Sequence, residues 1–579
     1  MKRKDTLFRI LRYLLRYKKQ LFFVLFLSVL GNLLTLAGPR ISGIAINLIT
    51  DGAKGGMDMP LILKYATLLF VFYVSGSLMG YAVNVSMITL SRKITYTLRK
   101  DVFDHLTTLP VGFFDTTTTG DILSRISYDI DTINASLSND VVQVLTSSVT
   151  IVGSFVMMVR ICPPLVLIFA VTIPLALVLA SYLTKMVQPM FRARSKAAGE
   201  LNGYVEEMIS GQKTLRAYTQ EERVIQEMNV QNKRLVDAYY KTDYYASIMG
   251  PSTNAINNLA LALISIFGAI LYLKGRIDMG GISAFVLYSR KFTGPIREIA
   301  EIYGELQSSL AAAERVFKVL DEAPEAADLP KARELSDAQG NVELQHVDFG
   351  YTKDRVILKD FSMTAKKGSM IAIVGPTGAG KTTFINLLMR FYDINRGKIL
   401  VDGTELDDIT RKSLRLAYSM VLQDTWLFYG TIYENIAYGR PEATREEVER
   451  AAKAAHIHTY IESLPKGYDT LLIDDGTNIS KGQKQLLTIA RALLMNTPML
   501  ILDEATSNVD THTEHQIQAA MRRLMEDKTC FVVAHRLSTI QNADCILVVR
   551  DGNVIERGSH RELLERRGFY YEMYQSQYQ

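Results

Sequence analysis

Cysteine is scarce in this chain of 579 residues, which has only three, at positions 162, 530 and 545. They lie far apart and show no CxxC spacing, so the sequence indicates neither a disulfide framework nor a cysteine zinc site. Net charge is small as well, at +5, and this total gives no support to a nucleic-acid partner. A chain of this length is nevertheless too long for one ordinary domain.

Long apolar runs are concentrated before about residue 310, although the whole chain is 48% hydrophobic and 22% charged. A helix needs roughly 20 apolar residues to cross a bilayer core of about 30 Å. The sequence therefore predicts six spanning helices in three pairs, at 20–48 and 61–86, 134–160 and 163–187, and 247–273 and 281–306. Residues 1–19 interleave basic and apolar side chains at helical spacing, which predicts an interfacial helix. No short apolar core with a cleavage site follows, so we expect the first span to stay in the mature protein.

The connections between these pairs are long and basic, whereas those within each pair are short. Residues 90–130 and 188–246 carry many Arg and Lys side chains, which the positive-inside rule assigns to the cytoplasm together with both chain termini. Few Gly or Pro residues and a helical charge spacing predict helices that project beyond the bilayer. Each of these two long segments is interrupted once, at 113–121 and near 210–212. We expect these interruptions to be the tips of the projecting helices.

Two cations interrupt the sixth apolar stretch. Arg290 and Lys291 lie about ten residues into it, where a charge facing lipid is costly. Three interpretations are open: the pair lines a substrate path, it is neutralised by a nearby carboxylate such as Glu298, or it snorkels to the membrane interface because the span is shifted. Three amides in other spans, Asn32, Asn84 and Asn257, are interpreted as packing contacts between helices rather than as ligand contacts.

The second half of the chain alternates short apolar strands with helices, and one junction carries a specific motif. The strand predicted at 370–374 leads into Gly375-Pro-Thr-Gly-Ala-Gly-Lys-Thr382, a full GxxxxGK[ST] signature, and a helix follows. Glycines let backbone N–H groups approach phosphates, and the helix N-terminus adds a positive dipole. Lys381 is expected to reach the terminal phosphates and the Thr382 hydroxyl to bind Mg²⁺.

Acidic and polar side chains follow other predicted strands of this half. Residues 499–502 form an apolar strand that ends in Asp503 and Glu504, and a parallel sheet presents them at the edge that carries the glycine-rich loop. Asp503 is expected to hold Mg²⁺, and Glu504 to orient and deprotonate a water. His535, after a third strand, is a candidate donor to the γ-phosphate. Gln423 is a candidate contact for Mg²⁺ and water that also links to the membrane half.

Together these elements resemble the ATP-binding-cassette (ABC) superfamily, over essentially the whole chain and in the order of exporter half-transporters. Thr119-Gly-Asp-Ile-Leu-Ser-Arg-Ile-Ser-Tyr-Asp129 resembles the first intracellular coupling segment of these exporters. Tyr351 matches the aromatic that stacks on adenine, Ser507-Asn-Val-Asp510 the loop that crosses the dimer, and Ile479-Ser-Lys-Gly-Gln483 the family signature. The nucleotide-binding residues implied in this way are Tyr351, Gly375, Thr377, Gly378, Gly380, Lys381, Thr382, Thr383, Ser480, Gly482 and Gln483.

The resemblance implies a multidomain chain, in which an all-α transmembrane domain of six helices precedes an α/β P-loop ATPase domain. We expect the first at 1–320, a linker rich in Ala, Glu, Asp and Pro at 321–338, and the ATPase domain at 339–579, in the cytoplasm. The implied activity is ATP hydrolysis coupled to export of amphipathic molecules across the cell membrane, with ATP and Mg²⁺. Two cassettes close head to tail on two ATP molecules, so a single copy cannot complete a site.

The signature departs from the usual Leu-Ser-Gly-Gly-Gln, because Ile479 replaces the leucine and Lys481 the first glycine. Residues 471–476 also differ from the usual form. Similar departures occur in exporters built from two different chains with one weak site, so the sequence favours a heterodimer over a homodimer. Two other functions remain open: an exporter-like importer of a metal chelate, and an ATP-gated channel or regulator. The sequence does not name the cargo.

Overall fold

The computed structural model of the chain divides into two compact units. One contains Met1–Thr107 with Thr119–Glu322, and the other contains Thr108–Thr118 with Ala323–Gln579. The structure describes residues 3–352, 354–423, 425–473, 476, 478–503, 510–533 and 540–578.

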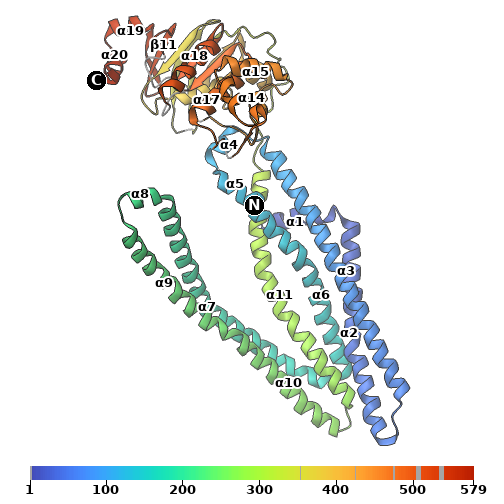
Figure 1. The fold of residues 1–579 in the computed structure, drawn as a ribbon. Helices are drawn as coiled ribbons and strands as arrows, with labels where there is room; N and C mark the ends of the chain where they lie inside the picture. The colour runs from blue at the N-terminus through green and yellow to red at the C-terminus, as the bar shows by residue number, and fades with distance from the viewer. Residues whose placement is uncertain are drawn as a thin grey trace. The chain divides into compact units, whose positions relative to one another are not determined.

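The first unit is helical, as predicted from its long apolar runs (Figure 1). A basic helix precedes two groups: α2, α3, α6 and α11 pack together, while α7, α9 and α10 form a long arm that ends at α8. Their bounds are α1 Arg3–Leu15, α2 Lys18–Gly55, α3 Met59–Leu106, α5 Thr119–Ser124, a π-helical turn η1 Arg125–Asp129, α6 Ile130–Ile161, α7 Pro163–Ser210, α8 Gln212–Ala217, α9 Glu221–Ser247, α10 Met249–Leu273 and α11 Met279–Leu320.

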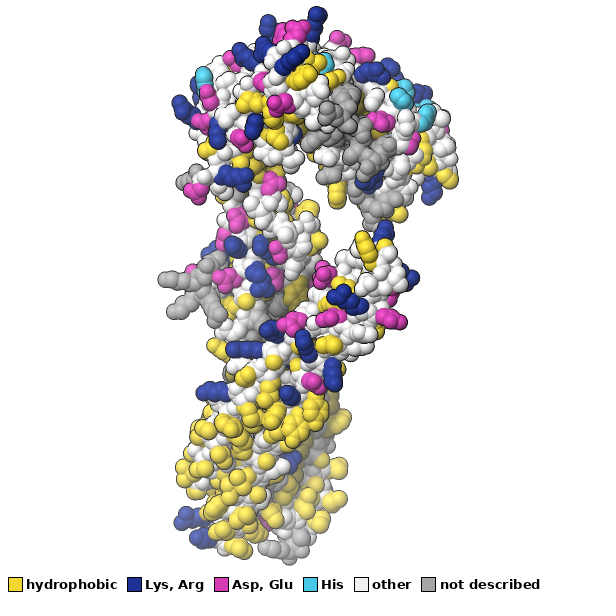
Figure 2. Space-filling model, turned by 90° about the vertical axis from the view of Figure 1, so that its left-hand side faces the viewer, with side chains coloured by type: hydrophobic (Ala, Val, Ile, Leu, Met, Phe, Trp, Pro, Cys, Tyr) yellow, Lys and Arg dark blue, Asp and Glu magenta, His cyan; other side chains and the backbone are white. Residues whose placement is uncertain are grey.

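Five helical stretches in the described residues are long and apolar enough to cross a membrane. Each contains one of the first five predicted spans: Lys18–Gly52, Met59–Leu106, Thr119–Ile161, Pro163–Ser210 and Glu221–Leu273. The sixth predicted span lies in α11. This helix is continuous, but its apolar run is interrupted by Arg290 and Lys291. A helix of 48 residues, the length of α3 and of α7, extends about 70 Å, more than twice the bilayer core. Hydrophobic side chains gather over the spanning parts, and charged ones over the extensions (Figure 2).

Helices α2 and α11 approach each other closely near the short connection that precedes α11. A Cβ atom on Gly280 would overlap the carbonyl oxygen of Gly43, so only glycine permits this packing. Asn47 accepts a hydrogen bond from the Gly280 N–H at 2.6 Å. Between α2 and α6, Asn32 donates to the Thr146 carbonyl at 2.7 Å, as predicted for a packing contact. The other two amides, Asn84 and Asn257, are exposed and make no described hydrogen bond.

The C-terminal end of α11 is bound to two other elements of the same unit. Arg315 donates two hydrogen bonds, of 2.9 and 2.5 Å, to the buried carboxylate of Asp129 in η1. Arg9 of α1 donates to Asp321 at 2.7 Å, which fixes the amphipathic helix to the end of α11. These ion pairs connect α11 to α1 and to the segment that follows α5.

The second unit is an α/β domain with two sheets. The larger has the order β12-β11-β3-β10-β9-β6 and is parallel except for β12, and the smaller is antiparallel with the order β2-β1-β4-β5. The strands are β1 Val342–Phe349, β2 Leu358–Ala365, β3 Met370–Val374, β4 Arg396–Val401, β5 Thr404–Glu405, β6 Tyr418–Val421, β9 Met499–Asp503, β10 Thr529–Val533, β11 Cys545–Arg550 and β12 Asn553–Gly558, with a separate pair β7 Gly430–Thr431 and β8 Leu471–Leu472.

Helices and two apolar cores surround these sheets. One core lies between β3 and the helix α12 with the small sheet, and the other between β9 and the helices around α17. The helices of this unit are α4 Val111–Thr116, α12 Lys381–Leu388, α13 Arg411–Leu416, α14 Ile432–Ala437, α15 Arg445–Ala454, α16 His458–Ser463, α17 Lys481–Met495, α18 Thr511–Met525, α19 His560–Arg566 and α20 Phe569–Tyr578, with short 3₁₀ turns η2 Leu406–Asp408 and η3 Gly467–Asp469.

The segment predicted as a linker is bound to this domain by arginines of α13. Arg415 donates two hydrogen bonds to Glu325, and Arg411 bonds Asp328 at 2.9 Å and the Ala326 carbonyl at 2.8 Å. Because three acceptors in four residues are held by one short helix, this part of the predicted linker is an ordered strap rather than a free connection.

Candidate nucleotide-binding site

The glycine-rich loop at 375–380 joins β3 to α12, as the motif predicts. Gly378 and Gly380 have φ angles of 82° and 106°, in the left-handed region that favours glycine. At Gly380 a Cβ would also lie 2.7 Å from a methyl carbon of Leu358. The sequence therefore needs glycine here on both conformational and steric grounds, and the resulting loop leads directly into the N-terminus of α12, where backbone N–H groups and the helix dipole favour anions.

Lys381, the first residue of α12, is folded back on the loop. Its side chain is 6% exposed, and Nζ donates to the carbonyl oxygens of Gly375 at 2.6 Å and Pro376 at 3.1 Å. A phosphate oxygen is a stronger acceptor for an ammonium group than a neutral carbonyl is, so Nζ is placed to bind an anionic ligand at the loop. The side chain of the next residue, Thr382, is exposed, as is that of Thr377 within the loop.

Asp503 and Gln423 lie at the sheet edge where this loop begins. Strand β10 separates β3 from β9, all three are parallel, and Val533 is level with both Ile373 and Asp503. Neighbouring strands are about 4.8 Å apart, so Asp503 follows the strand register at about 10 Å from the end of β3. Strand β6 pairs in parallel with β9 on its other side, and the exposed Gln423 follows it by two residues. The hydroxyl of Thr382, the Asp503 carboxylate and the Gln423 amide oxygen are the oxygen donors that Mg²⁺ prefers.

Several predicted residues lie outside the described part of the chain. They are Glu504, His535 and the first three residues of the predicted dimer-crossing loop, Ser507 to Val509. The last residue of that loop, Asp510, is described. It caps α18 by accepting the Thr513 N–H at 3.0 Å, and the hydrogen bonds from that residue hold the pKa of its carboxyl below the ordinary value.

The signature segment forms the N-terminus of α17. Ser480 and Gln483 make a capping box: the Ser480 Oγ accepts the Gln483 N–H at 3.3 Å, and the Gln483 Oε1 accepts the Ser480 N–H at 2.9 Å. Gly482 is buried, whereas the unusual Lys481 is exposed at the first helical residue. Among the described residues, no hydrogen bond or ion pair joins this turn to the loop and helix at 375–383.

Tyr351 is exposed by 45% and lies against the P-loop helix. Its hydroxyl is 3.2 Å from the Thr383 Oγ1 and accepts a hydrogen bond from Asn386 at 3.1 Å. Its ring makes edge-to-face contacts with Phe349, at a centroid distance of 5.1 Å, and with Tyr392, at 4.9 Å. The ring is therefore held next to α12 with part of its surface accessible to a ligand.

Tyr392 was missed by reasoning from sequence. Its hydroxyl donates to the carboxylate of Asp115 in α4, and Gly112 of α4 packs against its ring. Burial first, and then Asp115, raise the pKa of the Tyr392 phenol, so the hydroxyl remains a donor at neutral pH. The only sequence signal was its position shortly after the P-loop helix; nothing in the local pattern indicates a partner 277 residues away.

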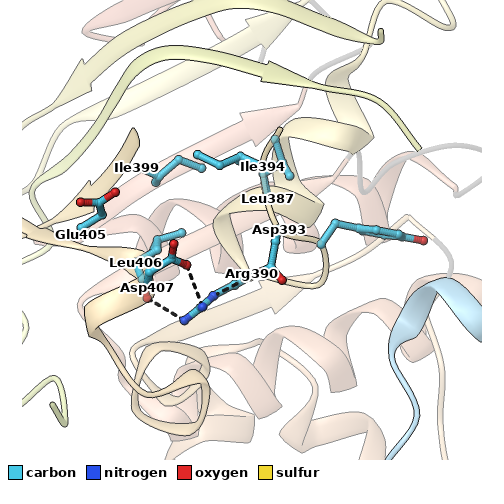
Figure 3. Close-up of a pocket in the computed structure, with 9 residues that line it drawn as sticks. Leu387, Arg390, Asp393, Ile394, Ile399, Glu405, Leu406 and Asp407 are labelled. Atoms are coloured by element: carbon cyan, nitrogen blue, oxygen red, sulfur yellow. Dashed lines mark hydrogen bonds and ion pairs between the residues drawn. The ribbon is translucent and has the colours of Figure 1, made fainter. Parts of the chain in front are cut away.

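Beside Tyr392, a small pocket overlies the buried guanidinium of Arg390 (Figure 3). Arg390 is 6% exposed and donates to the carbonyls of Leu406 at 2.7 Å and Ile409 at 3.2 Å, and to Asp407 at 2.7 Å. Because its donors are used within the protein, this arginine fastens the turn after α12 to η2. The pocket shares no lining residue with the glycine-rich loop, so we do not assign the nucleotide to it.

Comparison with known proteins agrees with this geometry. A family model described as the ABC transporter transmembrane region matches residues 21–296, and a model described as ABC transporter matches residues 358–507. An uncharacterised ABC transporter ATP-binding protein of Bacillus subtilis, YfiC, is 43% identical over 576 residues, which cover 100% of this chain and 95% of that protein. The chain belongs to the ABC transporter family.

This ABC transporter is also similar to proteins with more specific descriptions. A fatty acid ABC transporter ATP-binding/permease protein of Mycobacterium bovis is 44% identical over 518 residues, covering 90% of this chain and 82% of that protein. The structure of a bacterial Atm1-family ABC exporter with ATP bound matches with a TM-score of 0.78 and 31% identity, covering 97% of this chain and 98% of that chain. The predicted fold class, the exporter family and ATP hydrolysis coupled to transport are thereby confirmed, and the transporter is a membrane protein.

Proposed function

We propose that this transporter exports amphipathic molecules, such as drug-like compounds, lipids or peptides, across the cytoplasmic membrane as one half of a dimer. One observation carries the proposal: the chain contains both a P-loop at the start of α12 and a capped signature turn at the start of α17, the two parts that this family brings together from two chains at each ATP site. Each is then half of a site that a second chain completes. The similarity to a fatty acid transporter supports an amphipathic cargo.

The nucleotide roles follow from the chemistry of the loop and the sheet edge. Tyr351 stacks on adenine, the backbone of 375–380 and Lys381 hold the phosphates, and Glu504 deprotonates the attacking water while His535 donates to the γ-phosphate. Thr382, Asp503 and Gln423 hold Mg²⁺, which when bound offsets the charge of the phosphates. Phosphoryl transfer then depends mainly on the position of these groups.

The second half of each site comes from the signature turn of the other chain. Its Ser480, Gly482 and Gln483 approach the γ-phosphate, and the capping box keeps the turn in one conformation before ATP arrives. The exposed side chain of Lys481 stands where the usual signature has glycine, so the site completed by this turn is the weaker one. This asymmetry supports a distinct partner chain with a regular signature.

Transport follows from alternating access. Closure of two cassettes on ATP draws the helix tips together and opens the membrane path outward, and hydrolysis resets it. ATP shifts this equilibrium only by its preference for the closed state. The bond between Tyr392 and Asp115 supports a role of α4 as the coupling element. We accordingly assign 1–320 to the membrane domain, 321–338 to the strap and 339–579 to a cytoplasmic ATPase domain, with both termini inside.

A hydrolysis-deficient variant tests the catalytic assignment. Glu504→Gln in the reconstituted transporter should retain ATP binding but lose most hydrolysis, because the amide cannot accept the proton of the attacking water. The matched control is Glu526→Gln, an exposed carboxylate beyond the end of α18, which should hydrolyse ATP at the wild-type rate. Wild-type turnover by Glu504→Gln would remove this residue from catalysis.

Transport direction and partner are tested separately. Inside-out vesicles with the wild-type transporter should accumulate a fluorescent amphiphile when ATP is supplied, and accumulation only in right-side-out vesicles would identify an importer. The chain purified alone should show weak ATPase activity without transport coupling. Full coupled activity of the single chain would establish a homodimer and overturn the heterodimer.

A further inference from the structure

Two adjacent cations lie near the middle of the sixth predicted span. Arg290 and Lys291 are 11 and 12 residues from Met279, the first residue of α11, which corresponds to about 17 Å of helix rise. This is about half of a bilayer core of roughly 30 Å. An uncompensated Arg or Lys at this depth is costly, so such residues mark functional positions by default.

Lys291 is held by a neutral group. Its side chain is half-buried, and Nζ donates to the carbonyl oxygen of Thr35 in α2 at 3.0 Å. The neighbouring Tyr288 is fully buried and donates to the Leu36 carbonyl at 2.7 Å, so α11 is fixed to α2 at this level. Neither bond supplies a negative charge.

Glu298, named above as one possible partner of these cations, binds elsewhere. Its Oε2 accepts hydrogen bonds from Gln143 at 2.7 Å and from the buried Ser147 at 3.0 Å, both in α6. It lies seven residues beyond Lys291, about 10 Å along the helix axis. In the part of the chain that the structure describes, neither cation makes an ion pair.

Arg290 faces open space instead of a neighbouring helix. Its side chain is exposed, and so are Leu287 and Gly294, which lie on the same face one turn before and one turn after it. A Cβ built on Gly294 meets no atom within 4 Å, so the space beside the arginine extends along the helix. The guanidinium therefore offers its full fork of donors to a ligand.

We infer that Arg290 binds the anionic headgroup of an amphiphilic substrate, with a carboxylate as the best fit and Lys291 as a second positive charge at the same depth. The inference rests on the proposed export of amphiphiles and names the substrate class. A guanidinium binds a carboxylate through two parallel hydrogen bonds, and low dielectric strengthens them. The apolar spans around it suit an acyl chain, and a relative that is 44% identical is described as a fatty acid transporter.

The test compares an acid with its neutral ester. Lauric acid and methyl laurate are titrated against the ATPase activity of the assembled transporter in nanodiscs, for the wild type, Arg290→Gln and Arg290→Lys. Arg290→Gln should raise the lauric acid concentration that gives half-maximal stimulation about tenfold or more, the usual effect of losing a charged hydrogen-bond partner. The corresponding concentration of methyl laurate should not change. Arg290→Lys should recover part of the affinity. The control Lys274→Gln, in the connection before α11, should match the wild type for both compounds.

Each other result overturns the inference in a distinguishable way. An equal loss of apparent affinity for the acid and the ester would show that Arg290 has a structural role. No loss of apparent affinity for either compound would show that Arg290 does not contact the substrate. Dissociation of the assembled dimer or a lower melting temperature of Arg290→Gln without substrate would show pairing with a carboxylate of the partner chain. Wild-type stimulation by neutral amphiphiles alone would refute the anionic class and keep the proposed function, whereas stimulation by no amphiphile would refute both.

Discussion

Replacing Tyr392 with phenylalanine removes the hydroxyl that holds α4 on the ATPase domain and leaves the ring in place. The phenol donates to Asp115, while the ring keeps its contacts with Tyr351 and Phe349. The variant therefore separates two effects, because the hydroxyl acts on α4 and the ring acts on the predicted adenine-binding aromatic.

The expected loss of free energy depends on how far the hydrogen bond between Tyr392 and Asp115 is exposed to solvent. A hydrogen bond to a charged group contributes about 1.5–3 kcal/mol when it is shielded from water. Asp115 is exposed and Tyr392 half-buried, so solvent reduces this contribution to about 1 kcal/mol, as it does for exposed charged pairs. A change of about 1 kcal/mol alters an equilibrium constant about fivefold. We therefore expect the equilibrium constant for binding of α4 to the ATPase domain to fall about fivefold.

The assay is ATPase activity of the assembled transporter in nanodiscs, with and without a stimulating amphiphile. Tyr392→Phe should keep the basal KM for ATP and require about fivefold more amphiphile for half-maximal stimulation, because about 1 kcal/mol of coupling is lost. Asp115→Ala should have the same effect, and the double variant should be no worse than either single one. Tyr418→Phe is the matched control, since its buried hydroxyl has no hydrogen-bond partner among the described residues.

Two results would refute this reasoning. If the double variant required more amphiphile for half-maximal stimulation than either single variant, by the sum of the two single effects, Tyr392 and Asp115 would act through different partners. A raised KM for ATP in Tyr392→Phe, with stimulation unchanged, would show that the hydroxyl serves the nucleotide and not α4.

Three further predictions concern the ATPase domain. Tyr418→Phe should raise the apparent melting temperature of that domain by about 2–4 °C, because a buried hydroxyl without a partner costs about 1 kcal/mol; an unchanged or lower value would indicate that the hydroxyl is satisfied. Arg390→Met should lower the free energy of unfolding by about 2–4 kcal/mol, since the carbonyls of Leu406 and Ile409 lose a buried donor while Asp407 is largely exposed, and Arg390→Lys should recover little of it in denaturant titrations. Burial raises the pKa of the Cys530 thiol to about 12, so maleimide should label it at pH 8 only after unfolding, and mass spectrometry showing rapid labelling of the folded transporter would contradict this environment.

The P-loop was predictable because its whole mechanism is local. Eight consecutive residues contain the strand exit, the glycines and the helix start, and the left-handed conformation at Gly378 and Gly380 is a local requirement for glycine. The edge position of Asp503 was predictable for a related reason, since parallel strands share the direction of their carboxyl ends. The long helices were equally readable, because runs of apolar and then of charged residues at helical spacing persist over tens of positions.

Contacts between distant side chains were not predictable. The sequence left Glu298 open as one possible partner for the cations of its own helix, but α6 packs against α11 and offers Gln143 and Ser147 as donors. Nothing in the sequence of 321–338 indicates that Arg411 and Arg415 hold it. Such pairs have no period and no fixed spacing, so no window of sequence contains the information.

Composition and periodicity in this protein thus identify the helices, the strands and the phosphate loop, because these depend on neighbours within one or two turns of the chain. The hydrogen bond between α4 and Tyr392 and the exposure of the Arg290 side chain depend on which surfaces come together on folding. Burial and partner choice are properties of the packed chain, and they arise only when residues hundreds of positions apart compete for the same donors and the same space.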